Sequence, residues 1–110
     1  MEIKQTVVCL TALAQETRLA VFRLLVEAGH DGLCAGDIGA RLNVPAATLS
    51  FHLAQLANAG LVSARQQSRF IFYSADFEAM NGLVGFLTEN CCGGKPCPPA
   101  KPKRKKTLSA

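Results

Sequence analysis

The sequence lacks any long uncharged apolar run of the kind that spans a bilayer. Its first residues, Met1-Glu2-Ile3-Lys4, also lack the basic, apolar and small-residue layout of a secretion signal. We therefore expect no membrane association and a cytoplasmic protein whose thiols are reduced. In that compartment we expect the five cysteines to be ligands, redox groups or core residues rather than members of structural disulfides.

The patterns of catalysis are also missing. The chain has no paired base and nucleophile and no glycine-rich phosphate loop, and neither Cys91 nor Cys92 has a histidine partner in the sequence. We expect that the protein is not an enzyme.

Acidic residues are absent between Ile38 and Ala75, a stretch that carries Arg41, Arg65 and Arg69. A surface sorted by charge in this way suits a polyanion, and two copies in a dimer would double the effect. Chance is the alternative explanation, since three arginines are few.

What is present first is helical periodicity. At 110 residues the chain has room for one domain and a tail. Apolar residues at three- and four-residue spacing predict helices over 6–13, 16–28, 35–42, 45–59 and 77–89. The inward stripes of the first two are expected at Val7, Leu10 and Leu13, and at Leu19, Phe22, Leu25 and Val26.

Between the fourth and fifth of these helices the period changes to two. Residues 61–65 and 70–73 are predicted strands around the polar turn 66–68, although the turn lacks the usual glycine. The short turn between helices 35–42 and 45–59 is typical of a helix-turn-helix. The expected fold is mainly α with a β-hairpin wing, in the order ααααββα: a winged helix-turn-helix.

The second helix of that pair has an outer face suited to a duplex. Leu49, Leu53 and Leu56 should hold it to the core, while small and polar side chains cover the other side. Thr48, Ser50 and Gln55 can hydrogen-bond to base edges or phosphates. The predicted DNA-contacting residues are Ala46, Ala47, Thr48, Ser50, Phe51, His52, Gln55, Arg65 and Arg69.

Four of these side chains have a second interpretation. Phe51 either touches a thymine methyl group or folds back over the hairpin. His52 is interpreted as a packed or phosphate-contacting residue rather than a metal ligand, because no other histidine or acid lies beside it. Arg65 and Arg69 flank the hairpin tip, where they either meet phosphates or the minor groove or are simply solvated.

Three stretches resemble the ArsR/SmtB family of metalloregulatory repressors. They are Leu13-Ala-Gln-Glu-Thr-Arg-Leu19, the segment from Leu42-Asn-Val-Pro through Ser50-Phe-His-Leu53 to Gly60-Leu-Val62, and Arg69-Phe-Ile-Phe-Tyr73. The resemblance covers residues 6–90. It implies a homodimer built on the first and last helices, which blocks operator DNA at its own promoter until a toxic ion binds. Ala46 and Ala47 depart from the polar residues common in the family.

The segment Cys91-Cys92-Gly-Gly-Lys-Pro-Cys97 is chemically distinctive. Three sulfurs without a nearby histidine or carboxylate suit a soft, thiophilic centre, and Gly93-Gly94 can turn the chain so that the third thiol returns. Trivalent arsenic or antimony takes three thiolates, whereas zinc would need a fourth ligand. We therefore expect As(III) or Sb(III) as the effector, bound by Cys91, Cys92 and Cys97, and no cofactor for folding.

Two alternatives remain for these cysteines: a thiol-redox switch on the same fold, or tail residues without a function.

Elsewhere in the sequence, Cys34 is all that remains of the Cys-Val-Cys pair that some family sensors carry. Cys9 is expected to be a small buried residue. The last helix has no histidine, which argues against the zinc and nickel or cobalt sensors of the family. For the function of the whole protein, a third possibility beside a metalloid-responsive and a redox-responsive repressor is a metalloid-buffering or protein-interaction module that does not bind DNA.

The net charge of +4 comes from the end of the chain. Six of the twelve basic residues lie between Lys95 and Lys106, so residues 1–94 hold six basic residues against eight acidic ones. We divide the chain into a DNA-binding and dimerisation domain, 1–92, and a flexible tail, 93–110, with disorder expected over 98–110. The basic cluster of the tail is either solvated or attracts DNA weakly and without sequence preference.

Overall fold

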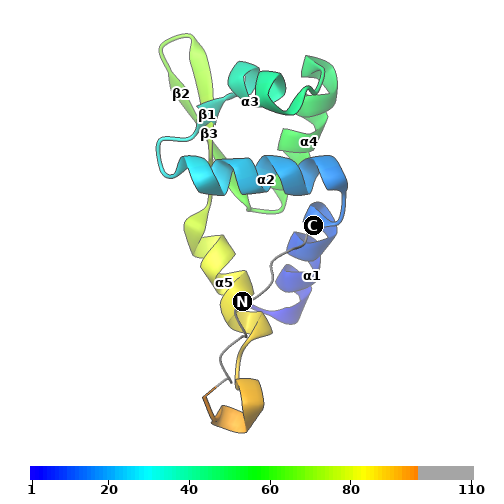
Figure 1. Ribbon diagram of the computed structural model, residues 1–110, viewed down its shortest axis with the longest axis vertical. Coiled ribbons are helices and arrows are strands. Elements are labelled where there is room, and N and C mark those ends of the chain that lie inside the picture. The colour runs from blue at the N-terminus through cyan, green and yellow to red at the C-terminus, as the bar shows by residue number, and fades with distance from the viewer. Residues whose placement is uncertain (97–110) are drawn as a thin grey trace, which may run out of the picture.

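The computed structural model describes residues 1–96. Helix α2 (Glu16–Ala28) crosses the middle of the molecule and separates two ends (Figure 1). On one side lie α3 (Ala35–Leu42), α4 (Ala46–Asn58) and a hairpin of β2 (Val62–Gln67) and β3 (Phe70–Ala75). On the other lie α1 (Ile3–Leu13) and α5 (Phe77–Leu87), followed by a short 3₁₀ turn, η1 (Cys91–Gly94). The predicted winged helix-turn-helix is confirmed, with its helix pair and hairpin at the same end.

The core lies where α2, α3 and α4 meet. Its most deeply buried side chains are mainly leucines and other aliphatic residues from the helices α1 to α4 and the loop after α4: Cys9, Val21, Leu25, Ile38, Leu49, Leu53, Leu56 and Leu61. The leucine stripe predicted for α4 is therefore confirmed. Burial of this stripe leaves the opposite side of α4 facing outward, as a helical period requires.

The hairpin is part of a three-stranded antiparallel sheet, ordered β1-β3-β2. Sequence periodicity missed β1 (Leu33–Cys34), because two residues are too few to show an alternation. Leu33 pairs with Tyr73, and the preceding Gly32 has a positive φ of 70°. A Cβ on Gly32 would overlap the carbonyl oxygen of Tyr73, so only glycine fits beside β3. The observed order is thus ααβααββα.

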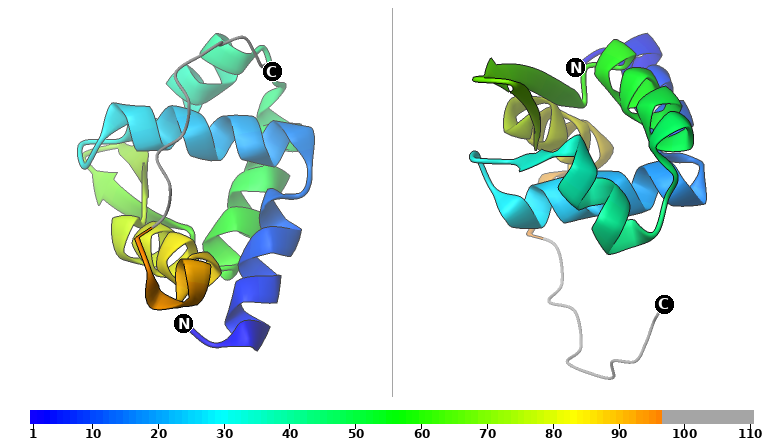
Figure 2. Two further views of the ribbon diagram at one scale, coloured as in Figure 1. Left: turned by 60° about the horizontal axis from the view of Figure 1, so that its bottom comes forward. Right: turned by 90° about the horizontal axis from the view of Figure 1, so that it is seen from above.

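The hairpin turn is shorter than expected. Gln67 pairs with Phe70, which leaves Ser68 and Arg69 as a two-residue loop. Ser68 has a φ of 61° and takes the position that glycine usually fills at such a tip. Both strands are therefore longer than the sequence pattern indicated, and Figure 2 shows the hairpin standing out from the helices.

The stripe predicted for the first helix is wrong at two of its three positions, and Leu13 alone packs partly against the core. Val7 and Leu10 are exposed, and the buried residues of α1 are Thr6, Cys9 and Ala12. The polar Thr6 can be buried because its hydroxyl donates to the carbonyl oxygen of Glu2 at 2.9 Å. Leu19 of α2, which was also expected to face inward, is exposed as well.

The end of the last helix also differs from the prediction. The last helix ends at Leu87, two residues earlier than predicted, and the chain then turns through η1. Within residues 1–96, none of the helices has the length and apolar content needed to cross a membrane.

Candidate nucleic-acid interface

The connection between α3 and α4 fixes the angle of the helix pair. Asn43 ends α3 in the left-handed conformation, and the Val44 amide donates to the Gly39 carbonyl at 3.0 Å. Pro45 precedes α4 with a φ of −60° and an extended ψ, where its missing N–H leaves no helical bond unmade. Residues 45–48 are all exposed, so α4 begins at the surface.

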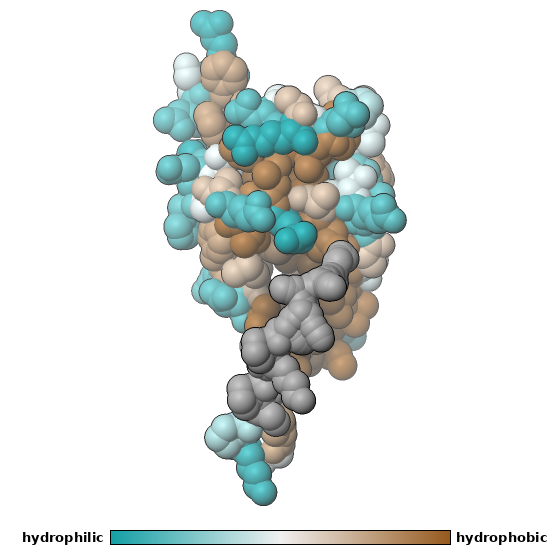
Figure 3. Space-filling view, in the orientation of Figure 1, coloured by the Kyte–Doolittle hydropathy of each residue, from teal (hydrophilic) through white to brown (hydrophobic). Residues whose placement is uncertain are grey.

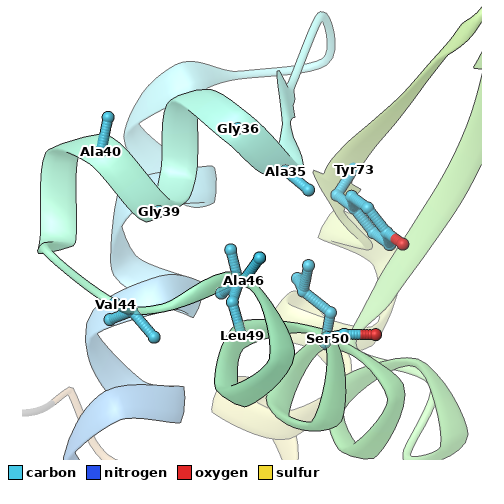
Figure 4. A pocket seen from close by; sticks show the side chains of 10 residues that line it. Ala35, Gly36, Gly39, Ala40, Val44, Ala46, Leu49, Ser50 and Tyr73 are labelled. Carbon is cyan, nitrogen blue, oxygen red and sulfur yellow. The ribbon is translucent and has the colours of Figure 1, made fainter.

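Small side chains line the gap between the two helices. Gly36, Gly39, Ala40 and Ala46 surround a cavity of about 380 Å³ whose floor is Leu49. In Figure 4 the side chains of Ser50 and Tyr73 both lie on the side of this cavity where β3 runs. Residues of α3, the first two turns of α4 and Tyr73 of β3 thus line one hollow at this end of the molecule.

The outer face of α4 is as open as predicted. The exposed residues on it are small, polar or, in one case, aromatic: Ala46, Ala47, Thr48, Ser50, Phe51, Ala54 and Gln55. The Phe51 side chain is 58% exposed and makes an edge-on contact with the ring of His52, with centroids 5.4 Å apart. Phe51 therefore points outward rather than folding over the hairpin.

His52 lies on the inner side of the same helix and is only 8% exposed. Its Nδ1 lies 3.1 Å from Nη1 of Arg18. Of the two alternatives predicted for His52, the structure thus supports the packed residue, and its burial leaves little surface for DNA. No pattern in the sequence assigned a role to Arg18, although it lies in a stretch that carries the family resemblance.

The two hairpin arginines differ from each other. The Arg65 guanidinium donates to the Asp31 carbonyl at 3.2 Å and to the Gln67 side chain at 3.5 Å, and it lies 5.6 Å from the centre of the Phe72 ring. Arg69 is an exposed residue of the tip loop. Arg65 is therefore held against the sheet, while Arg69 is placed to reach outward. With the exposed Arg41 of α3, they give this end three positive charges, against the carboxylates of Asp37 in α3 and of Asp31 beside Arg65.

The sulfur-bearing residues fall at separate places. Cys91 and Cys92 lie in η1, and their Sγ atoms are 3.3 Å apart. Asn90, Cys92, Gly93 and Gly94 all have positive φ, which turns the chain sharply after α5. The third predicted ligand, Cys97, lies outside the described residues. Within residues 1–96, no three histidine, cysteine or acidic side chains come together as a metal site.

The other two cysteines lie far from that turn in the sequence. Cys9 is fully buried, as predicted, and its thiol donates to the Ala59 carbonyl at 3.7 Å. Cys34 precedes α3, and its thiol lies 3.4 Å from a carboxylate oxygen of Asp37. Neither is joined by a further cysteine within the described part of the chain.

Comparison with known proteins agrees with this geometry. A family model described as a helix-turn-helix domain matches residues 13–64. The transcriptional activator HlyU from Vibrio cholerae is 31% identical over 88 residues, which cover 80% of this chain and 79% of that protein. The HlyU structure superposes with a TM-score of 0.63 over 79% of this chain and 97% of that one, at 34% identity. A further structure, of reduced HlyU from the same organism, matches with a TM-score of 0.62 at 33% identity and covers 76% of this chain and 88% of that one.

Two further similarities bear on the family. The structure of an ArsR-like transcriptional regulator from Rhodococcus has a TM-score of 0.68 at 27% identity and covers 76% of each chain. A putative arsenical resistance operon repressor, ArsR, from Halobacterium salinarum is 39% identical over 64 residues, 58% of this chain and 49% of that protein. These relatives are transcriptional regulators rather than enzymes, which confirms the expectation for this chain. The chain belongs to the ArsR/SmtB family of winged-helix, DNA-binding transcriptional regulators.

Proposed function

We propose that this regulator is a homodimeric repressor that binds operator DNA through α4 and the hairpin. The observation that carries the proposal is the outer face of α4, where Thr48, Ser50 and Gln55 are exposed while its leucines are buried. Small residues at the start of the helix, Ala46 and Ala47, let its backbone approach a duplex closely. Polar side chains beyond them can bond to base edges in the major groove.

The second subunit is needed because one helix reads few bases. In helix-turn-helix dimers the two reading helices enter successive major grooves, with half-sites about 34 Å apart. Arg69 at each hairpin tip would then meet a phosphate or the minor groove beside its half-site. The expected operator is therefore roughly palindromic.

The proposed dimer surface consists of the outer faces of α1 and α5. Ile3 is 68% exposed, Val7 55% and Leu87 59%, and all three lie at the end opposite the hairpin. Figure 3 shows hydrophobic residues over the part of this face where α1 lies. Large apolar side chains gathered on one end of a small protein favour a protein partner, and a second copy presents the same surface.

The proposed effector is trivalent arsenic or antimony, bound by the thiolates of Cys91, Cys92 and Cys97. The 3.3 Å between the Sγ atoms of Cys91 and Cys92 supports this assignment. Two sulfurs bound to one centre by bonds of about 2.3 Å lie about 3.8 Å apart at a tetrahedral angle and closer together at the narrower angles of a three-coordinate pyramid. The name of the Halobacterium salinarum relative also refers to arsenical resistance. Binding beside α5 would reorder the end of a dimer helix and weaken DNA binding.

The test is a fluorescence-anisotropy titration on promoter DNA upstream of the gene, with and without arsenite. The wild-type protein should bind this DNA with a dissociation constant in the nanomolar to micromolar range and release it when arsenite is added. A variant with Cys91, Cys92 and Cys97 all changed to Ser should bind equally well and no longer respond. Cys34→Ser is the matched control and should respond normally. If the triple variant still dissociates on arsenite, the effector site lies elsewhere.

A thiol-redox repressor is the second candidate, and the adjacent thiols of Cys91 and Cys92 also favour it. One structural neighbour is reduced HlyU, a name that states a redox condition of that protein. In this case two thiols would give two electrons and two protons to a peroxide, forming a disulfide and either two molecules of water from hydrogen peroxide or one of water and one of alcohol from an alkyl hydroperoxide. The same titration distinguishes the two: peroxide, and not arsenite, would then release DNA.

A further inference from the structure

Arg18 joins the helix of the proposed dimer surface to the helix that faces DNA. It lies in the first turn of α2, where the side chain of Gln15 accepts a bond from its backbone amide at 2.9 Å. Its Nε donates to the carbonyl of Ala12 in α1 at 2.6 Å, and its Nη1 lies 3.1 Å from Nδ1 of His52 in α4. In Figure 1 the connection from α1 to α2 lies beside α4.

The chemistry of this contact fixes its direction. A guanidinium group can only donate hydrogen bonds, so Nδ1 of His52 must be the ring nitrogen with the free lone pair. Ala12 belongs to the last turn of α1, where the final four carbonyls have no helical partner. One planar side chain therefore satisfies an otherwise open carbonyl of α1 and sets the orientation of the His52 ring.

Two more bonds tie α1 to the end of α4. The side-chain amide of Gln5 donates to the carbonyl of Ala59 at 3.2 Å, and the buried thiol of Cys9 donates to the same oxygen at 3.7 Å. Ala59 is the C-terminal cap of α4. Helix α1 thus contacts α4 at its C-terminal cap directly and at His52 through Arg18.

His52 lies within two residues of side chains on the DNA-facing side. Ser50 and Phe51 precede it on α4, and the rings of Phe51 and His52 are in edge-on contact. A rotation of α4 about its axis would therefore move Ser50 and Phe51 together with the His52 ring. The Arg18 contact opposes such a rotation because its other bond is anchored on α1.

We propose that Arg18 and His52 are positioning residues, which set the rotation of α4 relative to α1 and transmit movements of α1 at the subunit interface to the DNA-facing surface. This inference rests on the proposed operator binding by α4 and dimerisation through α1. It adds a route by which subunit packing alters DNA affinity without any contact between Arg18 and DNA. Substitution of either residue should then lower the affinity for operator DNA far more than the affinity for non-specific DNA.

The experiment compares affinities for promoter DNA and for a random duplex of equal length, using full-length variants. Arg18→Met and His52→Phe each keep the approximate size of the side chain and remove the bond. Each should lower the ratio of specific to non-specific affinity about tenfold, and the double variant should be no worse than either single one. His52→Gln keeps an acceptor for Arg18 and should restore the ratio to within about threefold of the wild type.

The matched control is Arg23→Met, which removes the same charge from an exposed position of the same helix. It should leave the ratio unchanged. A purely structural role for Arg18 would lower the melting temperature and leave the ratio of the folded protein intact, so circular dichroism at the assay temperature accompanies each titration. Additive losses in the double variant, or a His52→Phe ratio equal to that of the wild type, would overturn the proposal.

Hydrogen exchange on the free protein tests the link independently of any operator. Arg18→Met should speed amide exchange around His52 in α4, relative to α3, by about tenfold. Equal changes in both helices would contradict a specific link even if no promoter binding is found. Failure of the wild-type protein to prefer promoter DNA, with this exchange pattern intact, would instead count against the proposed function.

Discussion

Helices α4 and α1 both leave much of their surface to solvent, but their exposed side chains differ in kind. On α4 they are small or polar, with Phe51 as the one large exception. On α1 they include Ile3, Val7 and Leu10. A duplex groove is wet and polar, whereas a permanent subunit interface resembles a protein core. The exposed surfaces of the two helices are thus suited to partners of different chemistry.

The largest expected effect comes from placing charge on the apolar end. Val7→Glu combined with Leu87→Glu should convert the dimer into a folded monomer, because both side chains are already exposed in the protomer. Without the second half-site, operator affinity should fall by about a hundredfold or more. Analytical ultracentrifugation gives the mass and anisotropy gives the affinity.

Ala20→Glu, at an exposed position of α2, is the control and should remain a dimer. A double variant that stays dimeric and binds normally would show that the apolar end is not the subunit interface. The apolar surface of α1 would then not be a subunit interface, and its difference from the polar surface of α4 would not separate a protein partner from DNA.

The same contrast explains what the sequence could not reveal. Periodicity placed the leucines of α4 correctly, because a single apolar stripe on that helix faces the core. Helix α1 carries apolar residues on two sides, and Val7 and Leu10 lie on the outer one. Hydrophobic spacing does not separate a core from an interface, since both remove apolar surface from water. The small Cys9 and Ala12, with the bonded Thr6, form the true inner face.

Other features depended on contacts distant in the sequence. The outward positions of Thr48, Ser50 and Gln55 followed from the leucine spacing alone. The bond from Arg18 to His52 spans 34 positions in the chain, and no local pattern marks it. Strand β1 exists because β3 offers it partners, so its two residues carried no periodic signal of their own.

Substitution at Gly32 tests how far the DNA-facing end depends on β1. Gly32→Ala should destabilise the protein by about 2 kcal/mol or more, since a Cβ would meet the Tyr73 carbonyl and the φ of Gly32 is positive. Chemical denaturation measures the change. Gly36→Ala is the control: it lies in α3 with open space around it and should raise stability by up to about 1 kcal/mol. Equal stability of both variants would show that the close approach to β3 is not needed.

A smaller effect is expected on the polar side of the comparison. Gln55→Ala should lower operator affinity about tenfold and leave the dimer and the melting temperature unchanged, because the residue is exposed and a base contact contributes about 1–3 kcal/mol. Asn58→Ala, an exposed amide at the far end of the same helix, should have little effect. Competition titrations with altered operators would locate the base. If both variants bind alike, α4 contacts DNA only near its N-terminus.

The smallest expected effect concerns charge rather than shape. Truncation before Pro98 removes Lys101, Lys103, Arg104, Lys105 and Lys106, which lie outside the described residues. We predict a flatter dependence of affinity on salt, by about 0.9 in the logarithmic slope for each phosphate that the tail no longer neutralises, with operator preference unchanged. Anisotropy titrations at several salt concentrations give the slope.

Arg69→Gln removes a charge from the hairpin tip and should lower the slope by about one. If truncation leaves the slope unchanged while Arg69→Gln lowers it, the electrostatic attraction to DNA arises from the folded domain alone, at the end that carries Arg41, Arg65 and Arg69.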